Sequence, residues 1–208
     1  VSCNFKITKI LALELSKLFL EVIIANSFDT NALKILKKKK YLRLIDASNY
    51  KFNDSLKHVS VNNEVLIQSE DLKKFNTKDF KIVSKRKPTS KEMKNLIFAF
   101  NICRNVKSNA IVLASDETTA GIGSGQPSRL DSCKIAINKM KKFTNSNESL
   151  VAASDAFFPF VDGIEKLVQS GVQAVIQPSG SIRDKEIIKF ANETDTVLVF
   201  SRTRHFKH

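Results

Sequence analysis

The sequence has 208 residues, of which 42% are hydrophobic, and a formal net charge of +13 at pH 7. This length suffices for one well-buried core or two small lobes, and the hydrophobic content is too high for a disordered chain. No apolar run approaches the length of a bilayer-spanning helix, so we expect no membrane partner.

The first residues, Val1-Ser2-Cys3-Asn4, contain neither an initiator methionine nor the basic and apolar regions of a signal peptide. We therefore expect a fragment or a processed product of a cytoplasmic protein. The three cysteines, Cys3, Cys103 and Cys133, are far apart and form no Cys-x-x-Cys pair. This spacing predicts free thiols in a reducing compartment and no metal site.

The positive charge is concentrated in several basic clusters. Such clusters are typical of proteins that attract an anionic small substrate, of proteins that bind nucleic acid, and of lysine-rich solvated surfaces. Basic and aromatic residues are not interleaved as a stacking platform for nucleic acid requires, so we expect no nucleic-acid partner. The clusters lie at residues 37–40, 85–87, 139–142 and 202–207.

The N-terminal part of the chain is predicted to contain two helices, a strand and a hairpin. Near-continuous apolar character predicts a mostly buried helix over residues 10–25. Asp29 or Thr30 is expected to cap a second helix over residues 32–39, whose dipole favours the lysines at its end. A short strand over residues 41–45 and an irregular, polar stretch holding one hairpin over residues 49–81 complete this part.

The C-terminal part alternates helices and strands, which predicts an α/β layer architecture. Thr89 and Glu92 form a capping box that begins a helix ending near residue 106. A polar turn joins the two strands that come next, and a polar linker over residues 143–149 separates the two halves of this part. The expected strands are 110–114, 120–123, 172–176 and 196–200, and the expected helices are 128–142, 162–170 and 184–192.

Three glycines, Gly121, Gly123 and Gly125, lie between a predicted strand and a predicted helix. Glycines at such a junction allow backbone N–H groups to approach an anion near the helix N-terminus. The spacing matches neither a dinucleotide fingerprint nor a P-loop. A flexible turn without a ligand explains the same residues equally well.

Three further segments are candidates for a binding site. The aromatic residues in Ser154-Asp155-Ala156-Phe157-Phe158-Pro159-Phe160 are suited either to an apolar wall for a flat heterocycle or to a core plug. Ser179-Gly180-Ser181 lies between a strand and a helix, where ligands often bind in α/β proteins. The basic residues 202–208 follow a buried strand and are therefore expected near a pocket.

Together these segments resemble the AICAR transformylase family, in its order and with closely similar spacing. The resemblance rests on Lys107-Ser108-Asn109-Ala110, residues 121–129, residues 154–163, residues 177–184 and Arg204-His205-Phe206-Lys207-His208. Residues 18–25 and 32–39 also fit the family pattern. The similarity covers nearly the whole chain and is weakest over residues 47–80.

The resemblance implies formyl transfer from 10-formyltetrahydrofolate, a co-substrate, to AICAR ribotide in purine (IMP) biosynthesis. It implies a cytidine deaminase-like layered fold in duplicated lobes, with a mixed sheet flanked by helices and no metal. Residues 1–87 then correspond to the end of the first lobe with a variable hairpin region, and residues 88–208 to the second lobe. A homodimer, and an IMP cyclohydrolase domain in the parent protein, are also implied.

The family pattern also assigns binding residues. The positions that match its AICAR contacts are Glu21, Asn109, Arg129, Phe157 and Arg204, the last as an anchor suited to the phosphate. The positions that match its folate contacts are Leu130, Asp162, Ser181 and Ile182.

The catalytic Lys-His pair of the family belongs to a Lys-His-Val segment upstream of the region that this chain matches. Lys57-His58-Val59 has the same letters but falls in the polar hairpin stretch, so we assign no catalytic residue within the chain and expect the isolated chain to be inactive. His205 and His208 are expected to be structural or adjacent to the ligand. Two other functions stay open: a non-catalytic nucleotide- and folate-binding module and, on charge alone, a basic nucleic-acid-binding protein.

Overall fold

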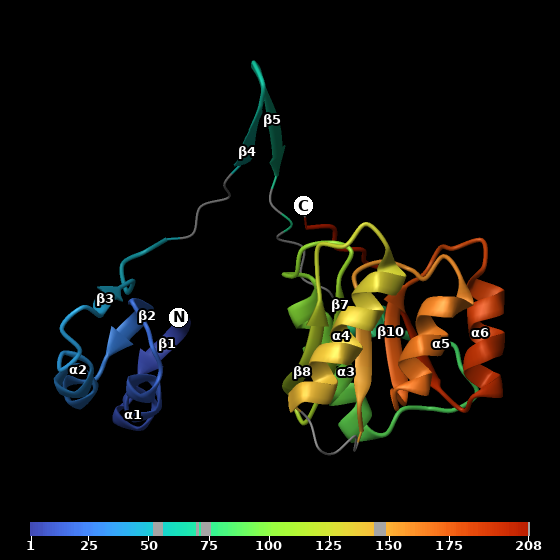
Figure 1. The fold of residues 1–208 in the computed structure, drawn as a ribbon, viewed down its shortest axis with the longest axis horizontal. Coiled ribbons are helices and arrows are strands. Elements are labelled where there is room, and N and C mark those ends of the chain that lie inside the picture. The colour runs from blue at the N-terminus through green and yellow to red at the C-terminus, as the bar shows by residue number, and fades with distance from the viewer. Residues whose placement is uncertain (52–55, 70, 72–75, 144–148, 208) are drawn as a thin grey trace. The chain divides into compact units, whose positions relative to one another are not determined.

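The computed structural model describes residues 1–51, 56–69, 71, 76–143 and 149–207. The chain divides into two compact units, Val1–Glu70 (unit 1) and Asp71–His208 (unit 2), which we describe separately. Figure 1 shows the helices and strands of both units, coloured from the N-terminus to the C-terminus.

Unit 1 contains a parallel sheet with strand order β1-β2-β3 and two helices. The elements are β1 (Ser2–Ile7), α1 (Lys9–Lys17), β2 (Val22–Phe28), α2 (Thr30–Leu36) and β3 (Arg43–Asp46). Ile23 and Ala25 of the central strand are fully buried against α1 and α2 residues such as Ala12 and Leu36. Asp29 occupies the N-cap position of α2, where its carboxylate pairs with Lys6 at 2.7 Å.

The predicted helix over residues 10–25 is wrong in its second half. The helix ends at Lys17, and the chain becomes β2 from Val22 onwards. Val22, Ile23 and Ile24 are β-branched residues that favour a pleated surface, and pairing with strands on both sides stabilises them as the central strand. The helix is also less buried than predicted, because Ile10 is 77% exposed.

A two-stranded antiparallel hairpin, β4 (Leu56–Val61) and β5 (Glu64–Ser69), ends the described part of unit 1. Asn62 in its turn has a positive φ of 53°, which asparagine tolerates better than most residues. The hairpin predicted within residues 49–81 is therefore confirmed. His58 lies on its exposed β4 strand.

Unit 2 is built on a six-stranded mixed sheet with order β6-β11-β10-β9-β7-β8. Strands β9, β10 and β11 are parallel to one another, whereas β7 runs antiparallel to β9 and β8, and β6 runs antiparallel to β11. The strands are β6 (Lys81–Ile82), β7 (Ile111–Ser115), β8 (Thr118–Gly123), β9 (Val151–Ser154), β10 (Ala174–Pro178) and β11 (Val197–Ser201); a short 3-10 helix (Thr77–Asp79) precedes them.

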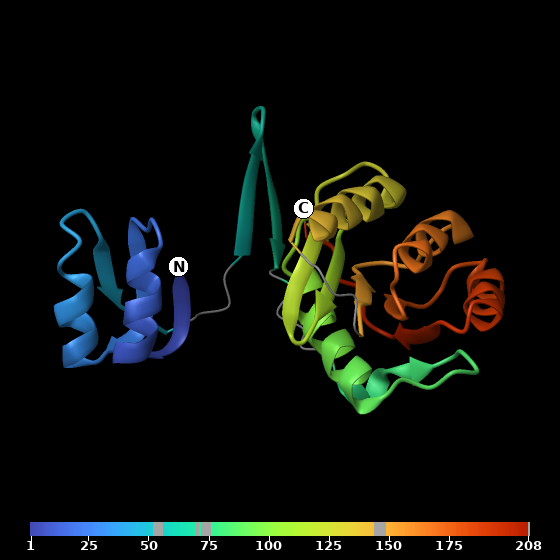
Figure 2. The ribbon, with the colours of Figure 1, turned by 60° about the horizontal axis from the view of Figure 1, so that its bottom comes forward.

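Helices cover both faces of this sheet, so the predicted α/β layer architecture with a mixed sheet is confirmed. Helix α3 (Ser90–Cys103) packs on one face, and α4 (Arg129–Phe143), α5 (Val161–Gln169) and α6 (Asp184–Glu193) pack on the other (Figures 1 and 2). Alternate residues of each strand supply the two cores: Val175 packs under α4 to α6, and Ile176 packs under α3.

The predicted capping box at the start of α3 is present. The Thr89 hydroxyl accepts a hydrogen bond from the Glu92 backbone N–H at 3.1 Å, and the Glu92 carboxylate accepts one from the Thr89 N–H at 2.8 Å. Arg86 also donates to this carboxylate at 2.6 Å. Helix α3 ends at Cys103, three residues before the predicted end.

Most other elements of unit 2 lie within a few residues of their predicted bounds. The structure contains one strand, β9, that was not among the predicted elements. It is short, and its four residues are all buried. The linker expected over residues 143–149 lies mostly outside the described residues. Within the described ranges, no helix combines the length and apolar character needed to cross a membrane, and no group of His, Cys, Asp and Glu is arranged to hold a metal ion.

Candidate functional site

A cavity of about 450 Å³ opens at one edge of the unit 2 sheet, within the size range of small-molecule sites. The carboxyl ends of the parallel strands and the amino end of antiparallel β7 meet at this edge, which brings several connecting segments together. The lining residues come from the segments before β7 and α4, after β9, at the start of α5 and after β11: Asn109, residues 127–130, residues 156–160, Asp162, Gly163, Arg204 and Phe206.

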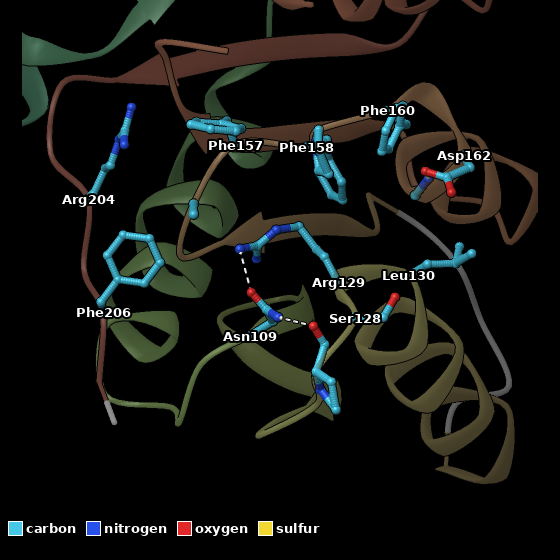
Figure 3. A pocket seen from close by; sticks show the side chains of 14 residues that line it. Asn109, Ser128, Arg129, Leu130, Phe157, Phe158, Phe160, Asp162, Arg204 and Phe206 are labelled. Carbon is cyan, nitrogen blue, oxygen red and sulfur yellow. Dashed lines mark hydrogen bonds between the residues drawn. The ribbon is translucent and has the colours of Figure 1, made fainter.

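The guanidinium of Arg129 lies at the centre of this pocket (Figure 3). Its Nη1 donates to Asp155 Oδ1 at 2.5 Å and to Ser154 Oγ at 3.0 Å, and its Nη2 donates to Asn109 Oδ1 at 2.8 Å. These bonds engage three of the five N–H groups of a guanidinium, so at most two are left for a ligand. Only 9% of the Arg129 side chain is exposed, which gives any such bond a low-dielectric setting.

Asn109 is held in one orientation by the segment before α4. Its Nδ2 donates to the backbone carbonyls of Gln126 at 2.9 Å and Pro127 at 3.1 Å, so its Oδ1 faces Arg129 (Figure 3). Its own backbone carbonyl accepts from the Ser132 hydroxyl at 2.7 Å. The first turn of α4, the loop before it and the start of β7 are thus locked together.

Asp155 is the residue that makes this arrangement possible, and the sequence pattern predicts no role for it. Its side chain is fully buried, and it accepts hydrogen bonds from Arg129 and from the Ser108 hydroxyl. A buried carboxylate is tolerated only when it is paired and hydrogen-bonded, and both conditions are met here. The available signal was an acidic residue two positions after the apolar run 150–153.

The three phenylalanines after β9 have different roles. Phe158 is 1% exposed and belongs to the core, where its backbone N–H donates to the Gln177 side-chain oxygen at 3.3 Å. Phe157 and Phe160 are more exposed and form parts of the cavity wall. The two alternatives predicted from the sequence are therefore both correct: Phe158 is a core residue, and Phe157 and Phe160 form an apolar wall.

Arg204 lies at one side of the cavity over the ring of Phe157, with its guanidinium carbon 4.8 Å from the ring centroid (Figure 3). Its Nη2 donates a long hydrogen bond of 3.5 Å to the Ser179 carbonyl. Within the described residues no carboxylate pairs with it, so its charge is available to an anionic ligand. Phe206, which sequence analysis did not single out as a site residue, lines the same side.

The glycines of β8 have a packing role that differs from the anion-binding interpretation. A Cβ added to Gly121 would lie 2.1 Å from the Ala136 carbonyl oxygen, and one added to Gly123 would lie 1.9 Å from that of Ser132. Both glycines therefore let β8 contact the backbone of α4. Of the three glycines Gly121, Gly123 and Gly125, only Gly125 has a positive φ, at 67°, a backbone conformation that favours glycine.

The four predicted folate contacts are not all brought together. Leu130 and Asp162 line the cavity, and Asp162 Oδ1 accepts from the Gly163 N–H at 2.7 Å. Ser181 and Ile182 lie in the loop between β10 and α6, outside the lining set, and Ile182 is fully exposed.

The predicted AICAR contacts also divide into two groups. Asn109, Arg129, Phe157 and Arg204 line the cavity in unit 2. Glu21 lies in unit 1, directly before β2, and is not among the lining residues.

Of the three histidines, His58 is exposed on β4, and His205, in the segment after β11, is 1% exposed. His208 lies outside the described residues. The cysteines are free thiols. Burial raises the pKa of Cys103 well above its ordinary value and that of Cys133 to about 12, so neither is a nucleophile at neutral pH.

Residues 1–139 match the family model of the AICARFT/IMPCHase bienzyme. The chain belongs to this family. It is 44% identical over 208 residues to the bifunctional purine biosynthesis protein PurH of Aquifex aeolicus, which covers 100% of this chain and 40% of that protein. PurH of Buchnera aphidicola is 46% identical over 194 residues, which cover 92% of this chain and 37% of that protein.

A third member of the bienzyme family, PurH of Limosilactobacillus reuteri, is 41% identical over 210 residues, which cover 100% of this chain and 41% of that protein. The chain thus spans about 40% of the length of the curated relatives that it matches. The family match agrees with the resemblance seen in the binding segments of the sequence.

Proposed function

We propose that this chain forms a substrate-binding part of a folate-dependent formyltransferase in purine biosynthesis, which transfers a formyl group from 10-formyltetrahydrofolate to AICAR ribotide. Membership of the AICARFT/IMPCHase bienzyme family supports the reaction class. The observation that carries the assignment of the site is the buried Arg129–Asp155–Asn109 network beside an aromatic wall and Arg204, which no carboxylate of the described residues pairs with.

On the AICAR side, Arg129 and Asn109 hold the polar edge of the ring and its carboxamide. Hydrogen bonds to neighbouring groups fix both side chains before the ligand arrives, so little conformational entropy is lost on binding. Phe157 packs beside the heterocycle and contacts it through its backbone. Arg204 takes the phosphate, for which a guanidinium provides paired donors. Glu21, in unit 1, is proposed as an acidic AICAR contact on the family pattern alone.

On the folate side, Leu130 and Asp162 contact the reduced folate from the opposite part of the cavity. Figure 3 supports this division, since Arg204 lies at one side and Leu130 and Asp162 lie at the other. Ser181 and Ile182 extend the folate contacts beyond the cavity, and full exposure of the apolar Ile182 side chain favours a ligand contact there.

The amine of AICAR ribotide is a poor nucleophile, because the ring and its carboxamide withdraw the nitrogen lone pair. The reaction therefore requires removal of an amine proton, stabilisation of a tetrahedral oxyanion and protonation of the leaving folate nitrogen. The residues of this chain hold the two substrates face to face. The proton transfers belong to the Lys-His pair of the family, which is outside these 208 residues, so the chain alone is expected to be inactive.

We also propose the larger architecture that the family resemblance implies. Residues 1–87 form the end of a first lobe and residues 88–208 a second lobe of a duplicated, cytidine deaminase-like fold. The complete protein is a cytoplasmic homodimer without a metal, and it carries an IMP cyclohydrolase domain as well.

Calorimetric titration of the 208-residue chain with AICAR ribotide tests this proposal. We expect saturable binding that Arg204→Ala weakens by about tenfold or more, because a charge-assisted bond to phosphate is lost. Arg202→Ala is the matched control, since Arg202 lines a different cavity. Absence of saturable binding by a folded chain, or equal effects of both substitutions, would contradict the proposal.

A further inference from the structure

The segment that follows β11 buries alternate side chains. Thr203 and His205 are 5% and 1% exposed, whereas Arg204 and Phe206 line the cavity. His205 therefore lies on the buried side of the two residues that this segment contributes to the pocket. No step of the proposed function uses His205 itself.

Three contacts hold His205 in place. Its Nδ1 lies 2.6 Å from Asp71 Oδ2, and because a carboxylate only accepts, the imidazole Nδ1–H is the donor. Its backbone N–H donates to the Asp155 carbonyl at 3.3 Å. Its ring packs edge-on against Phe100 of α3, with centroids 5.7 Å apart.

Arg204 has weaker contacts of its own. It makes one hydrogen bond of 3.5 Å to the Ser179 carbonyl and stacks on Phe157, which is itself part of the cavity wall. The direction of its guanidinium therefore depends on the backbone that carries it. The backbone that follows Arg204 is fixed by His205 and, two residues further on, by Lys207, whose carbonyl accepts from the Ser108 N–H at 2.8 Å.

We propose that His205, held by Asp71, is a positioning residue that fixes the segment after β11 so that Arg204 faces the ligand. The proposal rests on the proposed function for the identity of the ligand. The same anchor connects two parts of the site, because His205 donates to the backbone of Asp155, the carboxylate partner of Arg129.

Titration of the full chain with AICAR ribotide and with its unphosphorylated riboside tests this role. We expect His205→Leu to weaken ribotide binding by about tenfold and to leave riboside binding nearly unchanged, because only the ribotide uses Arg204. His205→Asn retains a side-chain N–H donor and should restore most of the affinity. His58→Leu, at an exposed histidine, is the matched control.

A double-substitution cycle separates positioning from a general structural effect. In an Arg204→Ala background, His205→Leu should cause no further loss of ribotide affinity, because the residue through which it acts is gone. Fully additive losses, or an unchanged affinity in His205→Leu alone, would overturn the proposal. Asp71→Ala, at a partly exposed carboxylate, provides a second variant if His205→Leu does not fold.

Amide hydrogen exchange tests the anchor without any ligand. The His205 and Ser108 amides should exchange at least about tenfold faster in Asp71→Ala, while those of β9 and α4 stay protected. Unchanged exchange would overturn the inference. If Asp71→Ala shows this faster exchange but the wild-type chain binds no ribotide, only the proposed function would be overturned.

Discussion

At the scale of single residues, the site depends on one buried ion pair. Arg129 and Asp155 are 9% and 0% exposed; Asn109 and Ser154 accept further hydrogen bonds from Arg129, and Ser108 donates one to Asp155. Such a pair adds little net stability relative to apolar residues, but removal of one partner leaves an uncompensated buried charge. Its value lies in the fixed direction of the guanidinium.

Asp155→Ala should therefore lower the free energy of unfolding by about 3–5 kcal/mol, because Arg129 is left buried without a counter-charge. Urea denaturation followed by circular dichroism measures this loss. Asp116→Asn is the control, since the Lys91–Asp116 pair is solvent-exposed and such pairs contribute less than about 1 kcal/mol. Similar losses for both variants would show that the buried pair has no special role.

Glu92 provides a pH-dependent contribution to stability. Burial raises the pKa of its carboxyl, but hydrogen bonds from the Thr89 backbone and from Arg86 outweigh this effect and lower the pKa overall. A folded-state pKa below the unfolded one stabilises the protein above the ordinary carboxyl pKa of about 4.3, and this stabilisation disappears as the pH falls through the lowered value.

Glu92→Gln should consequently destabilise the chain by about 2 kcal/mol at neutral pH and progressively less as the pH falls through the lowered pKa of Glu92, below which the carboxylate is protonated in both states. Urea unfolding of both proteins at several pH values gives the comparison. A stability difference that does not depend on pH would mean that the charge of Glu92 contributes nothing.

At the scale of secondary-structure elements, close packing of β8 on α4 positions the site, because Arg129 is the first residue of α4. Gly121 and Gly123 allow this contact, since an added Cβ would collide with helix backbone atoms that cannot move independently. The elements themselves were largely predictable from local sequence in unit 2, as the Thr89–Glu92 capping box illustrates.

Gly123→Ala should destabilise the chain by about 3 kcal/mol and weaken ribotide binding, because α4 must shift away from β8. Gly125→Ala tests the other property of glycine, since its Cβ would make only ordinary contact with the Lys107 side chain at 3.7 Å, while the positive φ should cost about 1 kcal/mol. Thermal unfolding and calorimetric titration of both variants provide the measurements. A smaller effect at Gly123 than at Gly125 would contradict the packing argument.

At the scale of the whole molecule, the chain consists of two compact units with separate hydrophobic cores. Unit 2 buries apolar residues on both faces of its six-stranded sheet and contains every residue that lines the cavity. From its size and its two packed cores we expect unit 2 to fold by itself.

A shortened chain containing only residues 71–208 should fold cooperatively and retain ribotide binding within about threefold of the full chain, except for any contribution from Glu21. Nuclear magnetic resonance spectra and calorimetry test both points. Well-dispersed spectra with no remaining affinity would show that unit 1 supplies a decisive contact. Poorly dispersed spectra, typical of an unfolded protein, would show that unit 2 needs the rest of the chain to fold.

The sequence by itself determined the α/β class, most elements of unit 2 and the family, because these depend on local periodicity, capping residues and motif order. Only the tertiary structure decided that residues 22–28 form a strand, that Gly121 and Gly123 pack against a helix, and that Asp155 pairs with Arg129. Each of these depends on partners that are distant in sequence: β1 and β3, the backbone of α4, and a guanidinium 26 positions away. Local propensity carries no information about such partners, because they meet only when the sheet and its helices assemble.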